Sequence, residues 1–158
     1  MIQQTNGDIL ANTNGIICHQ VNCRGVMGAG LAKQIKEKYP KVFEWYKHYC
    51  ESISPLHLLG YAQLVTIGKD KAGNSTLAIA NLFAQDNYGR TGVYTDYKAL
   101  EKCFVKVHDI AKEHKLTVYL PYGIGCGLAG GDWEKVEKLI NKIFGGTDVQ
   151  CTIVKLKK

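Results

Sequence analysis

Glycines gather at two places in the chain where backbone N–H groups can hold a phosphate. The first segment, residues 25–30, reads GVMGAG, and the second, residues 123–131, reads GIGCGLAGG. A glycine-rich turn can aim consecutive N–H groups at an anion, and a helix that begins there adds the positive end of its dipole. Two such segments at one edge of a sheet would bind a diphosphate from both sides, although each could also be only a tight turn.

Hydrophobic spacing predicts the helices that would position these segments. Apolar residues recur at i, i+3, i+4 and i+7 in three stretches. One begins at Pro40, one follows Thr95 or Asp96 as its N-cap, and one follows Asp132 and ends at the glycine pair 145–146. A shorter helix is expected over residues 28–39.

Short apolar runs between these helices predict strands at residues 15–19, 62–67, 77–83, 117–120 and 151–156. Their nearly continuous hydrophobicity is typical of strands that helices cover on both faces. Alternating strands and helices predict an α/β fold of three layers, α/β/α. Both glycine segments then follow a strand and precede a helix, which is where open α/β sheets bind ligands.

Composition limits the class of protein. The 158 residues, 46% of them hydrophobic, fit a single domain over residues 1–158 with an ordinary core. No run is long enough to span a membrane and the start lacks a secretory signal, so we expect no membrane contact and a cytoplasmic location. Six cysteines without a C-x-x-C pair predict reduced thiols and no metal site.

The net charge of +6 suits anionic partners such as nucleotides. The lysines are dispersed, so nucleic acid is not an expected partner and a nucleic-acid-binding domain is a distant alternative. A second alternative comes from residues 125–130, which read G-x-G-x-x-G, with Asp148 farther along. Only one strand can follow this motif, which leaves no room for the two halves of a nicotinamide-binding fold.

The sequence resembles a macro domain, the ADP-ribose-binding fold, over nearly its whole length. The motifs that carry the resemblance are Gly7-Asp8-Ile9-Leu10, then Val21-Asn22 followed by Met27-Gly28-Ala29-Gly30-Leu31-Ala32, then Pro121-Tyr122-Gly123-Ile124-Gly125-Cys126-Gly127. It implies a central mixed sheet of about six strands. The subgroup resembled, labelled "Appr-1-p processing", includes hydrolases that remove ADP-ribose from glutamate and phosphatases that act on ADP-ribose 1″-phosphate.

The resemblance also implies roles for particular residues. Asp8 would accept from the adenine amino group and the Ile9 N–H would meet a ring nitrogen, although Asp8 could instead be a turn or cap residue. Asn22 would bond the hydroxyls of the distal ribose. Tyr122 or Phe83 would pack on a sugar or base, although either could instead be a core residue. The remaining ligand contacts would come from the two glycine segments, at Met27, Gly28, Ala29 and Gly30 and at Ile124, Gly125, Cys126, Gly127 and Leu128.

The sequence departs from the subgroup at two positions. Its glutamate-specific hydrolases use a lysine after the central strand and an aspartate in the late loop, where this chain has Gln85 and Ala129. A carboxamide cannot form a covalent adduct with an opened ribose and alanine is no base. The nearest acid, Asp132, is predicted to be the N-cap of the following helix.

His19, at the end of the run 15–19, resembles a histidine of the phosphatase-like members. An imidazole near the distal ribose can protonate a leaving group or activate water, but a buried histidine with an internal partner is the competing interpretation. We therefore expect a monomeric macro domain that binds ADP-ribose or an ADP-ribosylated substrate. It would hydrolyse a bond at the 1″ carbon with His19 and Asn22 as catalytic residues, without a cofactor. A non-catalytic ADP-ribose reader is the main alternative.

Overall fold

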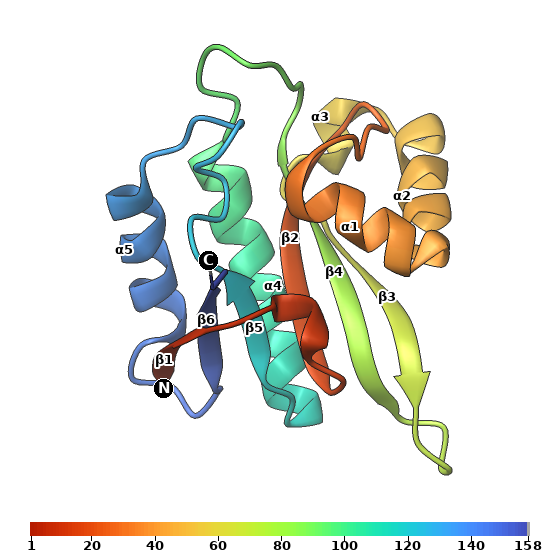
Figure 1. Cartoon of the computed structure of the whole chain (residues 1–158), viewed down its shortest axis with the longest axis vertical. Helices are drawn as coiled ribbons and strands as arrows, with labels where there is room; N and C mark the ends of the chain where they lie inside the picture. Colours follow the sequence, from red (N-terminus) through yellow and green to blue (C-terminus); the bar gives the residue numbers. More distant parts are fainter. Residues whose placement is uncertain (158) are drawn as a thin grey trace.

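A six-stranded sheet forms the centre of the computed structural model, which describes residues 1–157 (Figure 1). The strand order is β1-β6-β5-β2-β4-β3, and every neighbouring pair is parallel except β3 and β4. The strands are β1 (Ile2–Asn6), β2 (Gly15–Asn22), β3 (Ala62–Lys69), β4 (Ser75–Gln85), β5 (Val118–Pro121) and β6 (Cys151–Lys155). The predicted α/β fold with a mixed sheet is confirmed.

Four of the helices, α1, α2, α4 and α5, begin and end close to the predicted positions, whereas the short helices η1 and α3 were not predicted. They are the 3-10 helix η1 (Ile9–Ala11) and the α-helices α1 (Gly30–Lys38), α2 (Pro40–Ser52), α3 (Pro55–Leu58), α4 (Tyr97–His114) and α5 (Trp133–Phe144). Asp132 caps α5 as predicted, because its Oδ1 accepts from the Glu134 N–H at 2.9 Å. Asp96 caps α4 in the same way. Among the described residues, no helix is long and apolar enough to cross a membrane.

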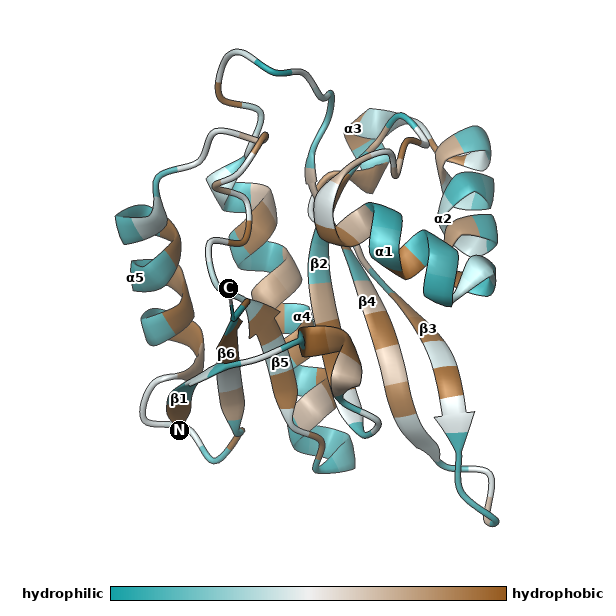
Figure 2. Ribbon diagram, in the orientation of Figure 1, coloured by the Kyte–Doolittle hydropathy of each residue, from teal (hydrophilic) through white to brown (hydrophobic). Residues whose placement is uncertain are grey.

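Helices cover both faces of the sheet, and alternate residues of β2 point to opposite faces. Ile16 packs in the cluster that includes Phe104 of α4, whereas Ile17 packs with Ile35 of α1 and Val42 of α2. Figure 2 shows the strands as mostly hydrophobic and the outer faces of the helices as hydrophilic. Burying each such side chain contributes about 1.5–3 kcal/mol, so these two cores fix the sheet edge that carries the glycine segments.

Strands β2, β3 and β4 extend beyond their predicted ends, and one strand was not predicted. β2 continues past residue 19 to Asn22, so His19 lies inside the strand and not at its end. The polar residues Gln20 and Asn22 are accommodated because their side chains are hydrogen-bonded within the fold. β1 was not predicted because IQQTN lacks an apolar run, and its position comes from parallel pairing with β6.

Candidate functional site

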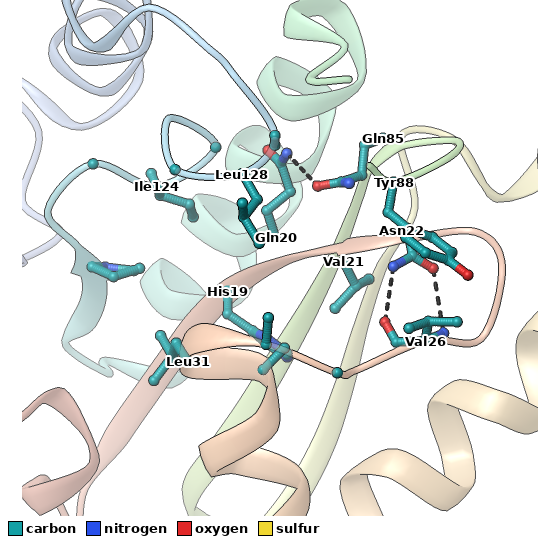
Figure 3. A pocket seen from close by; sticks show the side chains of 18 of the residues that line it. His19, Gln20, Val21, Asn22, Val26, Leu31, Gln85, Tyr88, Ile124 and Leu128 are labelled. Carbon is teal, nitrogen blue, oxygen red and sulfur yellow. Dashed lines mark hydrogen bonds between the residues drawn. The ribbon is translucent and has the colours of Figure 1, made fainter. Parts of the chain in front are cut away.

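A cleft of about 580 Å³ opens where the carboxyl ends of β5, β2 and β4 meet (Figure 3). Four parts of the chain line it: the end of β2 over residues 19–22, residues within 26–32, the end of β4 and the loop after it within 85–90, and residues within 121–129. The two glycine segments therefore converge on one cleft, as predicted from their places in the sequence.

The second glycine segment presents unpaired backbone donors at this cleft. Its turns are closed by the Cys126 N–H, which donates to Gly123 O at 2.8 Å, and by the Gly130 N–H, which donates to Gly127 O at 3.0 Å. Within residues 1–157, no acceptor is found for the backbone N–H groups of Gly125, Gly127, Leu128 and Ala129, all of which line the cleft. Unpaired N–H groups in such a turn form an anion-binding concavity.

A polar network beneath Gly125 holds this segment in place. Gln20 on β2 donates through Nε2 to Gln85 Oε1 on β4 and to Thr95 Oγ1, each at 2.9 Å. The Thr95 hydroxyl in turn donates to Gly125 O at 2.6 Å. Figure 3 shows the Gln20 and Gln85 side chains pointing toward each other above the sheet. The second glycine segment is thus tied to both central strands.

The first glycine segment places the start of α1 at the opposite wall of the cleft. Gly28 and Ala29 line the cleft together with Leu31 and Ala32 of the first turn. Ala29, the N-cap residue, provides no side-chain hydrogen bond to the helix. The first N–H groups of a helix have no partner inside it, and they carry the positive end of its dipole. The two walls therefore offer backbone donors to the same space.

Asn22 shapes the first glycine segment from within. Its Oδ1 accepts from the Tyr46 hydroxyl at 2.7 Å and from the Arg24 N–H at 2.9 Å, while its Nδ2 donates to Val26 O at 2.8 Å. These contacts fix the orientation of the carboxamide, because Oδ1 meets donors and Nδ2 meets an acceptor (Figure 3). One N–H of Nδ2 remains for a ligand.

His19 lies in the cleft wall and is the last member of a hydrogen-bonded chain of buried side chains. Asn81 donates through Nδ2 to Gln63 Oε1 at 3.0 Å, and Gln63 Nε2 donates to Trp45 O at 3.0 Å. Asn81 Oδ1 is therefore the acceptor for the Nε2–H of His19. This assigns the proton of the neutral ring to Nε2 and leaves Nδ1 as an acceptor, which is buried and has no partner among the described residues.

Burial also sets the charge of His19. It lowers the pKa of the imidazole to about 4, and the Asn81 contact offsets only part of that effect. The ring is therefore neutral at pH 7 and its only proton is engaged by Asn81. A neutral imidazole can accept a hydrogen bond, but it is poorly suited to protonating a leaving group.

The predicted catalytic and ligand-binding residues fall into two groups. Those that line the cleft are His19, Asn22, Gly28, Ala29, Tyr122, Ile124, Gly125, Gly127 and Leu128. Five others lie outside its lining: Asp8, Ile9, Met27, Gly30 and Cys126. Asp8 is the N-cap of η1 and accepts from the Leu10 N–H at 2.9 Å, as in the alternative interpretation of this residue. Met27 is buried beside Tyr46 and Phe83.

Sequence reasoning missed part of the lining. Gln20 and Val26 were not singled out, and neither were Gly89 and Arg90 of the loop after β4. That loop carries no motif, although Tyr88 follows a predicted strand that ends at the same sheet edge. Among residues 1–157, no group of three or more His, Cys, Asp or Glu side chains could hold a metal ion.

The model of the family described as "Macro domain" matches residues 18–140, a range that contains every segment lining the cleft. The chain belongs to the macro domain family. The resemblance to this family is therefore confirmed over residues 18–140, which include both glycine segments.

Similar proteins and solved structures add to this result. The chain is 27% identical to an ADP-ribose 1″-phosphate phosphatase of Debaryomyces hansenii, over 98% of this chain and 99% of that protein. It is 26% identical to a DNA ADP-ribosyl glycohydrolase of Mycobacterium bovis, over 91% of this chain but only 39% of that protein. A solved structure of a protein of unknown function from Bacteroides thetaiotaomicron superposes with a TM-score of 0.85 at 27% identity, covering 99% of this chain and 98% of the other.

Proposed function

We propose that this macro domain binds ADP-ribose in the cleft and hydrolyses a bond at its 1″ carbon. The substrate would be ADP-ribose 1″-phosphate or an ester-linked ADP-ribose. The observation that carries the proposal is the convergence of unpaired backbone N–H groups from both glycine segments on one cleft. This arrangement suits a pyrophosphate. Full-length similarity to an ADP-ribose 1″-phosphate phosphatase supports the choice of reaction.

The cleft has distinct ends that give the ligand a direction. Tyr122 follows β5, and its ring packs on Trp133 with a centroid distance of 4.7 Å while remaining 39% exposed. Lys155 lies 4.7 Å from the centroid of the same ring. An exposed aromatic face suits a base or sugar, so we place the adenosine at this end. The terminal ribose then lies toward β4, near Asn22 and Tyr88.

Hydrolysis at that end uses a water molecule and groups of the chain that orient it. The free N–H of Asn22 Nδ2 would donate to a hydroxyl of the terminal ribose. His19, neutral and protonated on Nε2, would accept a hydrogen bond from the water through Nδ1. In this scheme His19 orients the nucleophile, and the proton lost by the water passes to the leaving oxygen or to solvent.

The test offers the purified chain three substrates: ADP-ribose 1″-phosphate, O-acetyl-ADP-ribose and a protein carrying glutamate-linked ADP-ribose. The proposal predicts release of phosphate, acetate or ADP-ribose from at least one of them. The control is Gly125→Val, which should displace the backbone donors of the second glycine segment, because even a Cβ at this position would lie 2.8 Å from Gln20 Oε1. Failure to release product from all three would contradict the proposed hydrolysis.

A non-catalytic ADP-ribose reader is the second candidate, and one observation favours it. Gln85, at the place of the hydrolases' lysine, is committed to structure, because it accepts from Gln20 and donates through Nε2 to Asn87 O at 2.9 Å. Tight ADP-ribose binding without turnover of the three substrates would support the reader. Binding of single-stranded nucleic acid that collapses with salt would instead support the nucleic-acid alternative.

A further inference from the structure

Arg90 gives the cleft the only formal charge found among its lining residues within 1–157. Of the side chains that line it within residues 1–157, Arg90 alone is charged at neutral pH, since His19 is neutral. No carboxylate of the described chain lies within 4.0 Å of its guanidinium, whereas Arg24 is paired with Asp86 at 3.1 Å. An unpaired cation in a cleft wall is available to an anionic ligand.

The loop that carries Arg90 is packed against the second glycine segment. The Tyr94 N–H donates to Ala129 O at 2.7 Å, and the Tyr94 hydroxyl donates to Thr91 O at 2.6 Å. A Cβ added at Gly130 would lie 2.2 Å from Gly92 O, which shows how closely the two loops approach. Arg90 therefore stands on a loop held at its far end by main-chain contacts to the cleft wall.

The position of Arg90 separates it from the adenosine end. Arg90 follows β4 and Tyr122 follows β5, and β2 lies between these strands in the sheet. This step rests on the proposed function, in which the pyrophosphate lies between the glycine segments and the adenosine lies by Tyr122. The 1″ carbon and its substituent are then directed toward the β4 end, where Arg90 lines the cleft.

We propose that Arg90 determines specificity by binding the phosphate group attached to the 1″ carbon. Its planar guanidinium can donate two parallel N–H bonds to a phosphate, which a neutral acyl ester cannot match. This contact strengthens binding of ADP-ribose 1″-phosphate over O-acetyl-ADP-ribose and adds no chemical step of its own. It makes the phosphate monoester the preferred substrate of the cleft.

The test compares Arg90→Gln and Arg90→Lys with the wild type. Because Arg90 is exposed, both variants should fold, which melting curves check. Loss of the guanidinium should raise KM for ADP-ribose 1″-phosphate roughly tenfold, the usual scale for a lost charge-assisted hydrogen bond. KM for O-acetyl-ADP-ribose and Kd for ADP-ribose should change less than twofold. The KM of Arg90→Lys for ADP-ribose 1″-phosphate should lie between the values of the wild type and Arg90→Gln, because lysine keeps the charge but lacks the two parallel N–H donors of the guanidinium.

Lys71→Gln, in the exposed turn between β3 and β4, is the control for net charge and should match the wild type. If Arg90→Gln weakens the binding of ADP-ribose 1″-phosphate, O-acetyl-ADP-ribose and ADP-ribose by the same factor, the proposal is overturned, since Arg90 would then contact the diphosphate or attract any anion. If the wild type turns over no substrate, the proposed hydrolysis fails separately and calorimetry with intact ADP-ribose 1″-phosphate decides. If the wild type binds ADP-ribose 1″-phosphate more tightly than ADP-ribose, and Arg90→Gln abolishes this difference, the proposed role is supported. If the wild type binds both ligands with equal affinity, the proposed role is overturned.

Discussion

Gln20 and Gly125 meet so closely that a Cβ on the glycine would lie 2.8 Å from Gln20 Oε1. Gly125 also has a φ of +75°, a backbone angle that residues other than glycine rarely adopt. This contact joins the second glycine segment to the central strand β2 and fixes the position of the backbone donors proposed to bind phosphate.

Gly125→Ala should therefore destabilise the protein. The left-handed backbone alone costs an L-residue about 1–2 kcal/mol, and displacement of Gln20 adds to it, so we expect a loss of about 2–3 kcal/mol. Denaturant unfolding measures this loss. Gly127→Ala is the matched control, because a Cβ there has nothing within 4 Å and no left-handed φ. Equal losses in the two variants would contradict the role assigned to the Gln20 contact.

Burial of His19 should make stability depend on pH. The pKa is about 4 in the folded chain against 6.5 for an exposed histidine, so between these values the unfolded chain binds more protons. Stability should then fall as pH drops from 6.5 toward 4, by about 3 kcal/mol in total from this group. The His19→Gln variant should lose this component when unfolding free energies are compared from pH 7 to pH 4. Parallel pH profiles for the two proteins would show that His19 is not the group responsible.

Asn81 is expected to be a critical link in the interior. Asn81→Leu would leave the Nε2–H of His19 and Oε1 of Gln63 without partners inside the sheet. Stranding two buried polar groups costs about 2–4 kcal/mol. Urea unfolding should show this loss, whereas Asn141→Leu at an exposed site of α5 should change stability by less than about 0.5 kcal/mol. A loss below about 1 kcal/mol in Asn81→Leu would mean that the buried chain of hydrogen bonds contributes little.

Tyr46 connects α2 to the first glycine segment. Its hydroxyl donates to Asn22 Oδ1 at 2.7 Å and lies 2.8 Å from Asn22 O. Tyr46→Phe keeps the buried ring and removes only this support, so we expect a stability loss of about 1 kcal/mol. If Asn22 positions the terminal ribose, affinity for ADP-ribose should also fall a few-fold in calorimetry. Unchanged affinity together with the expected stability loss would limit Tyr46 to a structural role.

The sequence predicted the features that depend on local spacing. The glycine segments, the N-cap Asp132 and the long helices follow from residue types a few positions apart, and the structure places them as expected. The convergence of both segments followed from the rule that parallel strands present their carboxyl ends at one edge. These features required no knowledge of distant contacts.

Features that depend on distant contacts were not predicted. His19 was placed at a strand end, because the polar residues after it do not show that β2 continues to Asn22. The partner of His19 lies on β4, and only strand pairing reveals it. Arg90 likewise enters the cleft because its loop packs on the second glycine segment, a contact without a local signal.

The most direct test of the account follows backbone amide signals of the isotope-labelled chain by NMR during titration with ADP-ribose. We predict that the amides of residues 28–32 and 125–129 shift together and saturate at the same ligand concentration, because both segments hold one pyrophosphate. Signals that stay fixed in both segments, or that move in only one of them, would contradict the claim that the two glycine segments form a single ADP-ribose site.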